Sequence, residues 1–181
     1  MSTAPDGSPV GLYTRLPELG EGEVVASVLP VGASVLELGC GAGRITRQLI
    51  RLGRRFDAVL LASNLVNAEP PRRRAFLETC RRHADLVVVE GLPLAWSPED
   101  GETTFGDVLS RLHVDRVEAG VVHGEMEYEA GSDRWRHSFA MHVFADEVEL
   151  AAALAEAGLR FERRLDARWF AAVRRDSRGA A

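Results

Sequence analysis

Lysine is absent from this chain of 181 residues, and all 22 of its cationic side chains belong to arginine. Without lysine there is no amine for a Schiff base and no side chain for a Walker-type phosphate clamp. The formal net charge is -5, so the chain also lacks the basic field that a nucleic acid requires. These absences exclude several classes of enzyme, and we expect no nucleic-acid partner.

Cysteine is scarce as well, since the chain contains only Cys40 and Cys80, outside any CxxC or CxxH spacing. This excludes a disulfide framework, predicts no metal site and favours a reducing, cytoplasmic setting. No apolar run approaches the ~18 residues that cross a bilayer, and the first residues show no signal pattern, so we expect no membrane association.

The composition that remains is that of a folded domain, because 46% of the residues are apolar. We expect a single domain over residues 1–181, with a disordered lead over 1–12 and a frayed tail over 176–181.

Apolar runs of strand length alternate with amphipathic helical segments in the first half of the chain. This order predicts an open α/β sheet whose first strands are parallel and joined by right-handed crossovers. The expected strands are Ser34 to Leu38, Phe56 to Ala62 and Leu86 to Glu90, and the expected helices are Glu21 to Leu29, Arg44 to Leu52 and Arg72 to His83.

The second half changes to alternating polar and apolar residues, which predicts an inserted β-hairpin cover over 117–144 with its turn at Gly131-Ser132. A helix from Asp146 to Ala157 and an antiparallel pair, Arg160 to Leu165 and Arg168 to Arg174, are expected to complete the fold. Pairing Ala130 with Asp133 sets Glu129 against Arg134 and Glu127 against Arg136 on one face, and Tyr128 against Trp135 and Val122 against Met141 on the other.

The segment Glu37-Leu-Gly-Cys-Gly-Ala-Gly43, directly after an apolar strand, resembles the first motif of class I S-adenosylmethionine-dependent methyltransferases. Phe56 to Asn67 is similar to the fourth motif of that family, and the terminal helix with its antiparallel pair is typical of its tail. The resemblance implies a Rossmann-like fold, S-adenosylmethionine as cofactor, and methyl transfer to a small-molecule acceptor.

The glycines of this turn allow a ligand to approach the backbone closely, and the following helix offers free N–H donors. The alternative is a tight strand-to-helix turn that binds nothing. Asn64 and Asn67 follow the second strand, where the resemblance places groups near the acceptor; both could instead cap the turn. The cofactor-binding residues that we expect are Glu37, Gly39, Cys40, Gly41, Gly43, Ser63 and Asn64.

No catalytic base can be assigned from the sequence. His123, His137 and His142 lie on the expected cover, where a histidine could remove a proton from an acceptor or simply face solvent. Aromatic residues in this half, among them Trp96, Trp135, Trp169, Tyr128 and Phe139, either line an acceptor pocket or pack in the core.

One part of the family pattern is missing between Gly53 and Phe56. The family has there a strand ending in a ribose-binding acid, then a helix and a further strand. Asp57 lies 20 residues beyond Glu37 but begins its strand, whereas ligands bind at the carboxyl ends. Either the first helix has changed face, or its crossover is left-handed, or the chain is shortened by an outer strand–helix–strand unit at Leu52-Gly53.

The shortened fold has two consequences. The strand Ser34 to Leu38 would have an exposed apolar edge, which predicts a homodimer through that edge or poor solubility. The second is functional: the alternative to an active enzyme is a catalytically silent, truncated methyltransferase-like protein with impaired cofactor binding.

Overall fold

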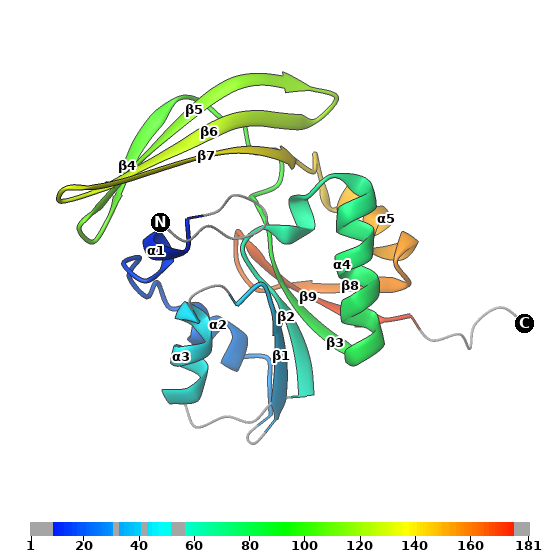
Figure 1. Cartoon of the computed structure of the whole chain (residues 1–181). Helices are drawn as coiled ribbons and strands as arrows, with labels where there is room; N and C mark the ends of the chain where they lie inside the picture. The colour runs from blue at the N-terminus through cyan, green and yellow to red at the C-terminus, as the bar shows by residue number, and fades with distance from the viewer. Residues whose placement is uncertain (1–8, 31–32, 41–42, 52–56, 176–181) are drawn as a thin grey trace, which may run out of the picture.

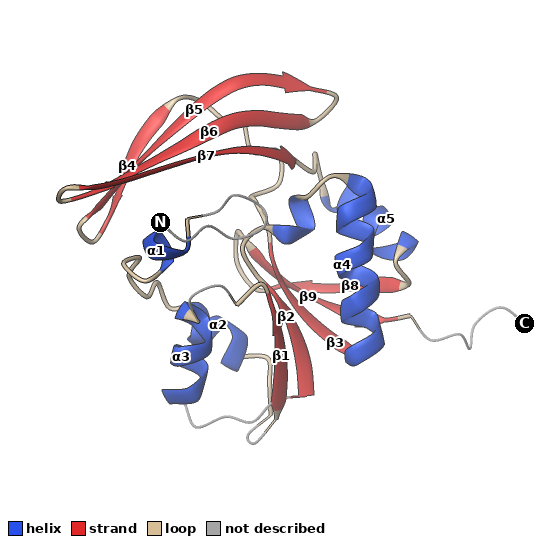
Figure 2. Ribbon diagram, in the orientation of Figure 1, coloured by secondary structure: helices blue, strands red, loops and turns tan. Residues whose placement is uncertain are grey.

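Two β-sheets, one above the other, form the framework of the molecule (Figures 1 and 2). The structure is a computed structural model, and it describes residues 9–30, 33–40, 43–51 and 57–175. The lower sheet is covered by helices, and the upper sheet lies across its carboxyl-terminal edge. None of the helices in these ranges is long and apolar enough to cross a bilayer.

The lower sheet has the strand order β1-β2-β3-β9-β8. Its first three strands are parallel, and β9 pairs antiparallel with both β3 and β8. The expected mainly parallel sheet with an antiparallel C-terminal pair is therefore confirmed. The strands are β1 (Ser34–Leu38), β2 (Asp57–Leu61), β3 (Leu86–Glu90), β8 (Leu159–Arg164) and β9 (Trp169–Arg174).

Helices cover both faces of this sheet because its central strands are apolar on both sides. Leu60 packs with α2 (Glu21–Ala26) and α3 (Arg44–Arg51) on one face. Its neighbour Leu61 packs with α4 (Pro70–His83) and α5 (Glu147–Glu156) on the other, as successive strand residues point to opposite faces. The helix predicted at Arg44 to Leu52 thus lies on the same face as α2.

This placement gives two neighbouring crossovers opposite hands. The connections β1–α3–β2 and β2–α4–β3 both step in the same direction across parallel strands. Their helices lie on opposite faces of the sheet. Because about 98% of such crossovers are right-handed, one of these two departs from the rule. The expected junction at Leu52-Gly53 lies outside the described residues.

The upper sheet, called the cover sheet below, is antiparallel in the order β4-β5-β6-β7. The predicted pairing of Ala130 with Asp133, and every cross-strand pair that follows from it, is confirmed. The expected hairpin is nevertheless too small, because two further strands precede it. The strands are β4 (Gly101–Phe105), β5 (Val108–Glu118), β6 (Val121–Ala130) and β7 (Asp133–His142).

Pattern reading missed β4 and β5 for identifiable reasons. The sequence Gly-Glu-Thr-Thr-Phe of β4 is mostly exposed and has no apolar alternation. In β5 the polar residue Ser110 is buried, which interrupts the alternation of polar and apolar residues. A bulge between Val114 and Arg116 then shifts that alternation by one residue.

The lead is partly structured. The short helix α1 (Val10–Tyr13) contains Leu12, which is fully buried against Trp135 and its neighbours in the cover sheet. Arg15 donates to the carbonyl of Ala130 at 3.0 Å and pairs with Asp133. The disorder expected over residues 1–12 therefore does not extend to these positions, while residues 1–8 and the tail 176–181 lie outside the described ranges.

Candidate functional site

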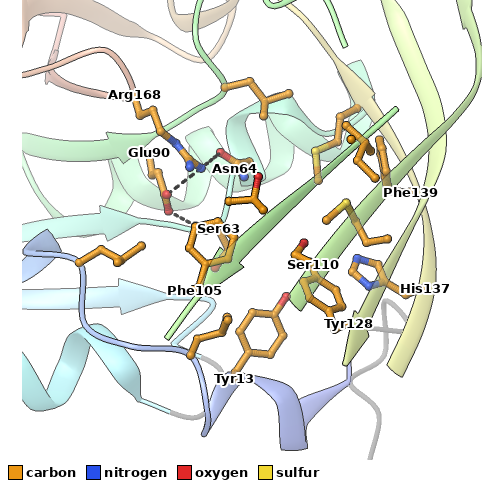
Figure 3. Close-up of a pocket in the computed structure, with 18 of the residues that line it drawn as sticks. Tyr13, Ser63, Asn64, Glu90, Phe105, Ser110, Tyr128, His137, Phe139 and Arg168 are labelled. Carbon is orange, nitrogen blue, oxygen red and sulfur yellow. Dashed lines mark hydrogen bonds and ion pairs between the residues drawn. The ribbon is translucent and has the colours of Figure 1, made fainter. Parts of the chain in front are cut away.

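A pocket of about 530 Å³ lies between the cover sheet and the carboxyl ends of β2 and β3 (Figure 3). This volume is typical of small-molecule sites, and the carboxyl ends of strands are where open α/β sheets bind ligands. Residues around α1 close a third side. We call this space the covered pocket.

The wall from the lower sheet is built on an unusual turn after β2. Ser63 and Asn64 both have left-handed backbone conformations, with φ of 60° and 55°. The Ser63 N–H donates to Glu90 Oε2 at 2.8 Å, and Arg168 Nη2 donates to Asn64 Oδ1 at 3.0 Å. Arg168 Nη2 also lies 3.0 Å from Glu90 Oε1. The ends of β2 and β3 and the start of β9 are thereby tied together at the pocket.

The 3-10 turn η1 (Leu65–Asn67) joins this wall to the cover sheet. Asn67 is completely buried; its Nδ2 donates to the carbonyl of His142 at 2.8 Å, and its Oδ1 accepts from the Leu92 N–H at 2.9 Å. Leu92 follows the end of β3, where the chain leaves the lower sheet, and His142 is the last residue of the cover sheet. Asn67 therefore holds the segment that leads from the lower sheet to the cover sheet and the segment that returns from it, a role more specific than the expected turn cap.

The wall from β5, β6 and β7 presents polar side chains, among them Ser110, Tyr128 and His137. The rings of Tyr128 and His137 stack with centroids 5.9 Å apart, and Ser110 is the cross-strand partner of Tyr128 (Figure 3). Burial raises the pKa of the Tyr128 phenol, and Tyr13, across the pocket on α1, acts in the same direction. The Tyr128 hydroxyl is therefore neutral at ordinary pH.

The three histidines of the expected cover have different surroundings. His137 lines the covered pocket. His123 lies 3.3 Å from Arg116 on the opposite face of the sheet, and His142 contacts Glu149 Oε1 at 2.8 Å. Strand parity alone could have separated His137 from His123, because Tyr128 and His137 belong to the face that carries the apolar residues.

The aromatic residues divide in the same way. Trp96, Tyr128 and Phe139 line the covered pocket. Trp135 packs against α1, and Trp169 is buried in the core beside α2 and α3. The sequence left open whether these aromatic residues line a pocket or pack in the core, and each alternative is correct for some of them.

The described residues of the glycine turn after β1 are not among those that line the covered pocket. Gly39 and Gly43 have φ of +77° and +73°, and the Gly43 N–H donates to the Cys40 carbonyl at 2.7 Å. The left-handed backbone at Gly39 favours glycine whether or not a ligand binds, and a Cβ there would lie 2.9 Å from the end of the Leu65 side chain, Cδ1. Glu37 accepts a hydrogen bond from the Thr46 hydroxyl.

The predicted site residues therefore fall into two groups. Ser63 and Asn64 line the covered pocket, whereas Glu37, Gly39, Cys40 and Gly43 form the neighbouring turn. Gly41 lies outside the described residues. Glu90 and Arg168 were missed, because neither has a motif around it and only the meeting of β3 with β9 brings them together.

The outer side of β1 has no partner strand among the described residues. Leu36, in the middle of β1, is 43% exposed. Asp57 accepts a hydrogen bond from Ser34 Oγ at 2.9 Å at the other end of the strands, which confirms that it is a surface contact away from the pocket.

Comparisons with known proteins agree with this architecture. No family model and no curated protein matches the sequence. Among solved structures, the chain is similar to the CcbJ methyltransferase from Streptomyces caelestis, with a TM-score of 0.65 and 15% identity over 92% of this chain and 95% of that one. It also aligns with the N-terminal domain of EvdMO1 with SAH bound, at a TM-score of 0.44 and 21% identity over 93% and 85% of the two chains. The likeness to CcbJ shows that this chain has a methyltransferase fold.

Proposed function

We propose that this protein carries out S-adenosylmethionine-dependent methyl transfer to a small-molecule acceptor. The observation that carries the proposal is the covered pocket, which is enclosed by a separate sheet at the carboxyl ends of β2 and β3 in a methyltransferase fold. An acceptor held there is shielded from water on several sides. The contribution of the chain to catalysis is then mainly positioning, through the tied turn at Ser63 and Asn64.

The described residues fit one half of the cofactor. The turn with left-handed Gly39 and Gly43 leaves Gly39 and Cys40 exposed, and the resemblance places the methionine portion beside Glu37. The nucleoside half has no counterpart in this part of the chain, because no described strand flanks β1 on its outer side.

A second candidate function follows from the lack of a described counterpart for the nucleoside half of the cofactor. It is a catalytically silent, truncated methyltransferase-like protein. Two observations favour it, the open side of β1 and the opposite hands of the crossovers through α3 and α4. Removal of an outer strand–helix–strand unit would produce both, because it joins α3 to β2 without moving either from its place in the longer fold.

Calorimetry with S-adenosylmethionine and S-adenosylhomocysteine separates the two functions. The enzyme requires binding at concentrations below a millimolar, and the absence of binding at that concentration would establish the silent protein. Glu37→Gln is expected to weaken binding by about tenfold, the effect of losing one charge-assisted hydrogen bond. Glu118→Gln, at the end of β5, is the matched control and should leave binding unchanged.

Thiol labelling locates the bound cofactor in the same experiment. Cys40 is exposed in the turn, whereas Cys80 is buried, and burial raises the pKa of the Cys80 thiol to about 12. At pH 8 a disulfide reagent should therefore label Cys40 alone in the native protein. Cofactor bound at the turn should slow this labelling; binding without protection would place the cofactor elsewhere.

We further propose that a second copy of the chain covers the outer side of β1. Leu36 is one of few large apolar side chains that stay substantially exposed in the described ranges. Leu36→Lys should convert a dimer to a monomer in light scattering, because a charged side chain opposes pairing at a sheet edge. Val148→Lys, on the exposed side of α5, is the control. A native chain that is monomeric, or a Leu36→Lys variant that still dimerises, would contradict this interface.

A further inference from the structure

Along β5, β6 and β7, the described residues of the cover sheet that line the pocket include no acidic or arginine side chain. The residues of β5, β6 and β7 that line it are Ser110, Leu112, Met126, Tyr128, His137, Phe139 and Met141. The outer face carries the opposing charges, including Arg111 at 2.6 Å from Glu102 and Arg136 at 3.0 Å from Glu125. Because side chains alternate along a strand, these three strands separate a solvated charged face from a pocket face without acidic or arginine side chains. In β4 of the same sheet, Glu102 also lines the pocket.

The ion pair of Arg168 with Glu90 on the facing wall is satisfied within the protein, and Glu21 and Glu99 are further acidic residues that line the pocket. Both carboxylate oxygens of Glu90 are used, one by the Ser63 N–H and one by Arg168. Arg168 also donates to Asn64. A ligand carboxylate in the covered pocket would meet these carboxylates and would either break this network or remain an unpaired buried charge, which is strongly unfavourable. The pocket therefore disfavours an anionic ligand.

The shape and chemistry of the lining favour aromatic rings. Tyr13, Phe105, Tyr128 and Phe139 contribute rings from separate elements (Figure 3). Met126 and Met141 add thioethers, which pack favourably at ring edges. Rings of a ligand can stack or meet these side chains edge to face without any charged partner.

Hydrogen-bonding groups are concentrated in one part of this apolar lining. His137 stacks on Tyr128, Ser110 is opposite Tyr128 across the strands, and the phenol of Tyr13 is close enough to affect the Tyr128 pKa. Tyrosine and serine hydroxyls can donate or accept, whereas a neutral histidine also offers a ring nitrogen as acceptor. A hydroxyl group on the ligand finds its complement here.

We propose that the covered pocket binds an aromatic alcohol in preference to an aromatic carboxylate, with its rings among Phe105, Phe139 and the methionines and its hydroxyl directed to His137. As the class of acceptor this rests on the proposed methyl transfer. The binding itself requires no cofactor and is measured without it.

Calorimetry of the unmodified protein with three naphthalenes of similar size tests the selection. We expect 2-naphthol to bind, 2-methoxynaphthalene to bind about tenfold more weakly because it cannot donate a hydrogen bond, and 2-naphthoate to bind at least a hundredfold more weakly. Equal affinity for 2-naphthol and 2-naphthoate, or no binding of 2-naphthol, overturns the proposal.

The role of His137 is tested by His137→Phe, which keeps an aromatic ring beside Tyr128 and removes both ring nitrogens. This variant should lose the tenfold preference for 2-naphthol over 2-methoxynaphthalene while binding the latter unchanged. His123→Phe, on the outer face of the same sheet, should retain the preference. A preference that survives in His137→Phe overturns the assignment of His137.

The same preparations distinguish this proposal from the proposed function. Binding of 2-naphthol without binding of S-adenosylmethionine would leave the ligand class standing and remove the methyltransferase activity. Binding of S-adenosylmethionine without any binding of 2-naphthol would leave the proposed methyltransferase activity standing and remove the proposed ligand class.

Discussion

Replacing Asn67 by leucine is expected to lower the free energy of unfolding by about 2–5 kcal/mol. The substitution leaves the carbonyl of His142 and the N–H of Leu92 without their side-chain partner, and each buried group that loses its hydrogen bond costs about 1–3 kcal/mol. For a domain of this size the thermal midpoint should fall by roughly 5–15 °C. Circular dichroism or calorimetry measures the shift.

Asn64→Gly is the matched control for this prediction. Asn64 lies in the same turn, has a left-handed backbone that glycine adopts readily, and makes an exposed contact with Arg168. Its thermal midpoint should change by only a few degrees. Similar midpoints for the two variants would show that Asn67 does not fasten the cover sheet to the lower sheet.

Replacing Gly124 by alanine should destabilise the cover sheet by about 2–3 kcal/mol. A Cβ at this position would lie 2.4 Å from the backbone oxygen of His113 and 2.9 Å from the ring of Phe139. The backbone oxygen belongs to the paired strand β5 and cannot move without breaking the ladder, so overpacking cannot be relieved by a side-chain rotation. Because Phe139 also lines the covered pocket, ligand affinity should fall with stability.

Gly101→Ala provides the comparison for Gly124→Ala. Gly101 is in β4 of the same sheet, and a Cβ added there would have the Glu99 backbone oxygen as its nearest neighbour, at 3.9 Å. We expect a change within about 0.5 kcal/mol, as for an ordinary surface substitution. Hydrogen exchange in β5 and β6 should rise in Gly124→Ala alone; unchanged exchange would contradict the packing described at Phe139.

The elements of the lower sheet could be predicted because their signals are local. Ser34 to Leu38 and Leu86 to Glu90 match the observed strands in full, and α5 begins after Asp146, whose carboxylate accepts from the Glu149 N–H. The pairing of β6 with β7 was also predictable, since a two-residue turn determines the register of the strands that it joins.

The candidate site was predictable only in part. Ser63 and Asn64 were found because they follow a buried strand, and they do line the covered pocket. Glu90 and Arg168 were not, because they are far apart in the sequence and meet only when β9 inserts beside β3. His137 could have been chosen over His123 from strand parity, because the predicted register already places it on the face of Tyr128 and Trp135.

The sequence by itself determined the strands and helices of the lower sheet and the glycine turn at Gly39 and Gly43, because each depends on residues close together in the chain. Only the tertiary structure decided that α3 shares a face with α2, that β4 and β5 enlarge the cover, and that a pocket lies beneath it. These features depend on which faces of the elements pack together. Packing brings together residues that are far apart in the chain, and the hydrophobic periodicity of a short segment does not show which distant segment it will contact.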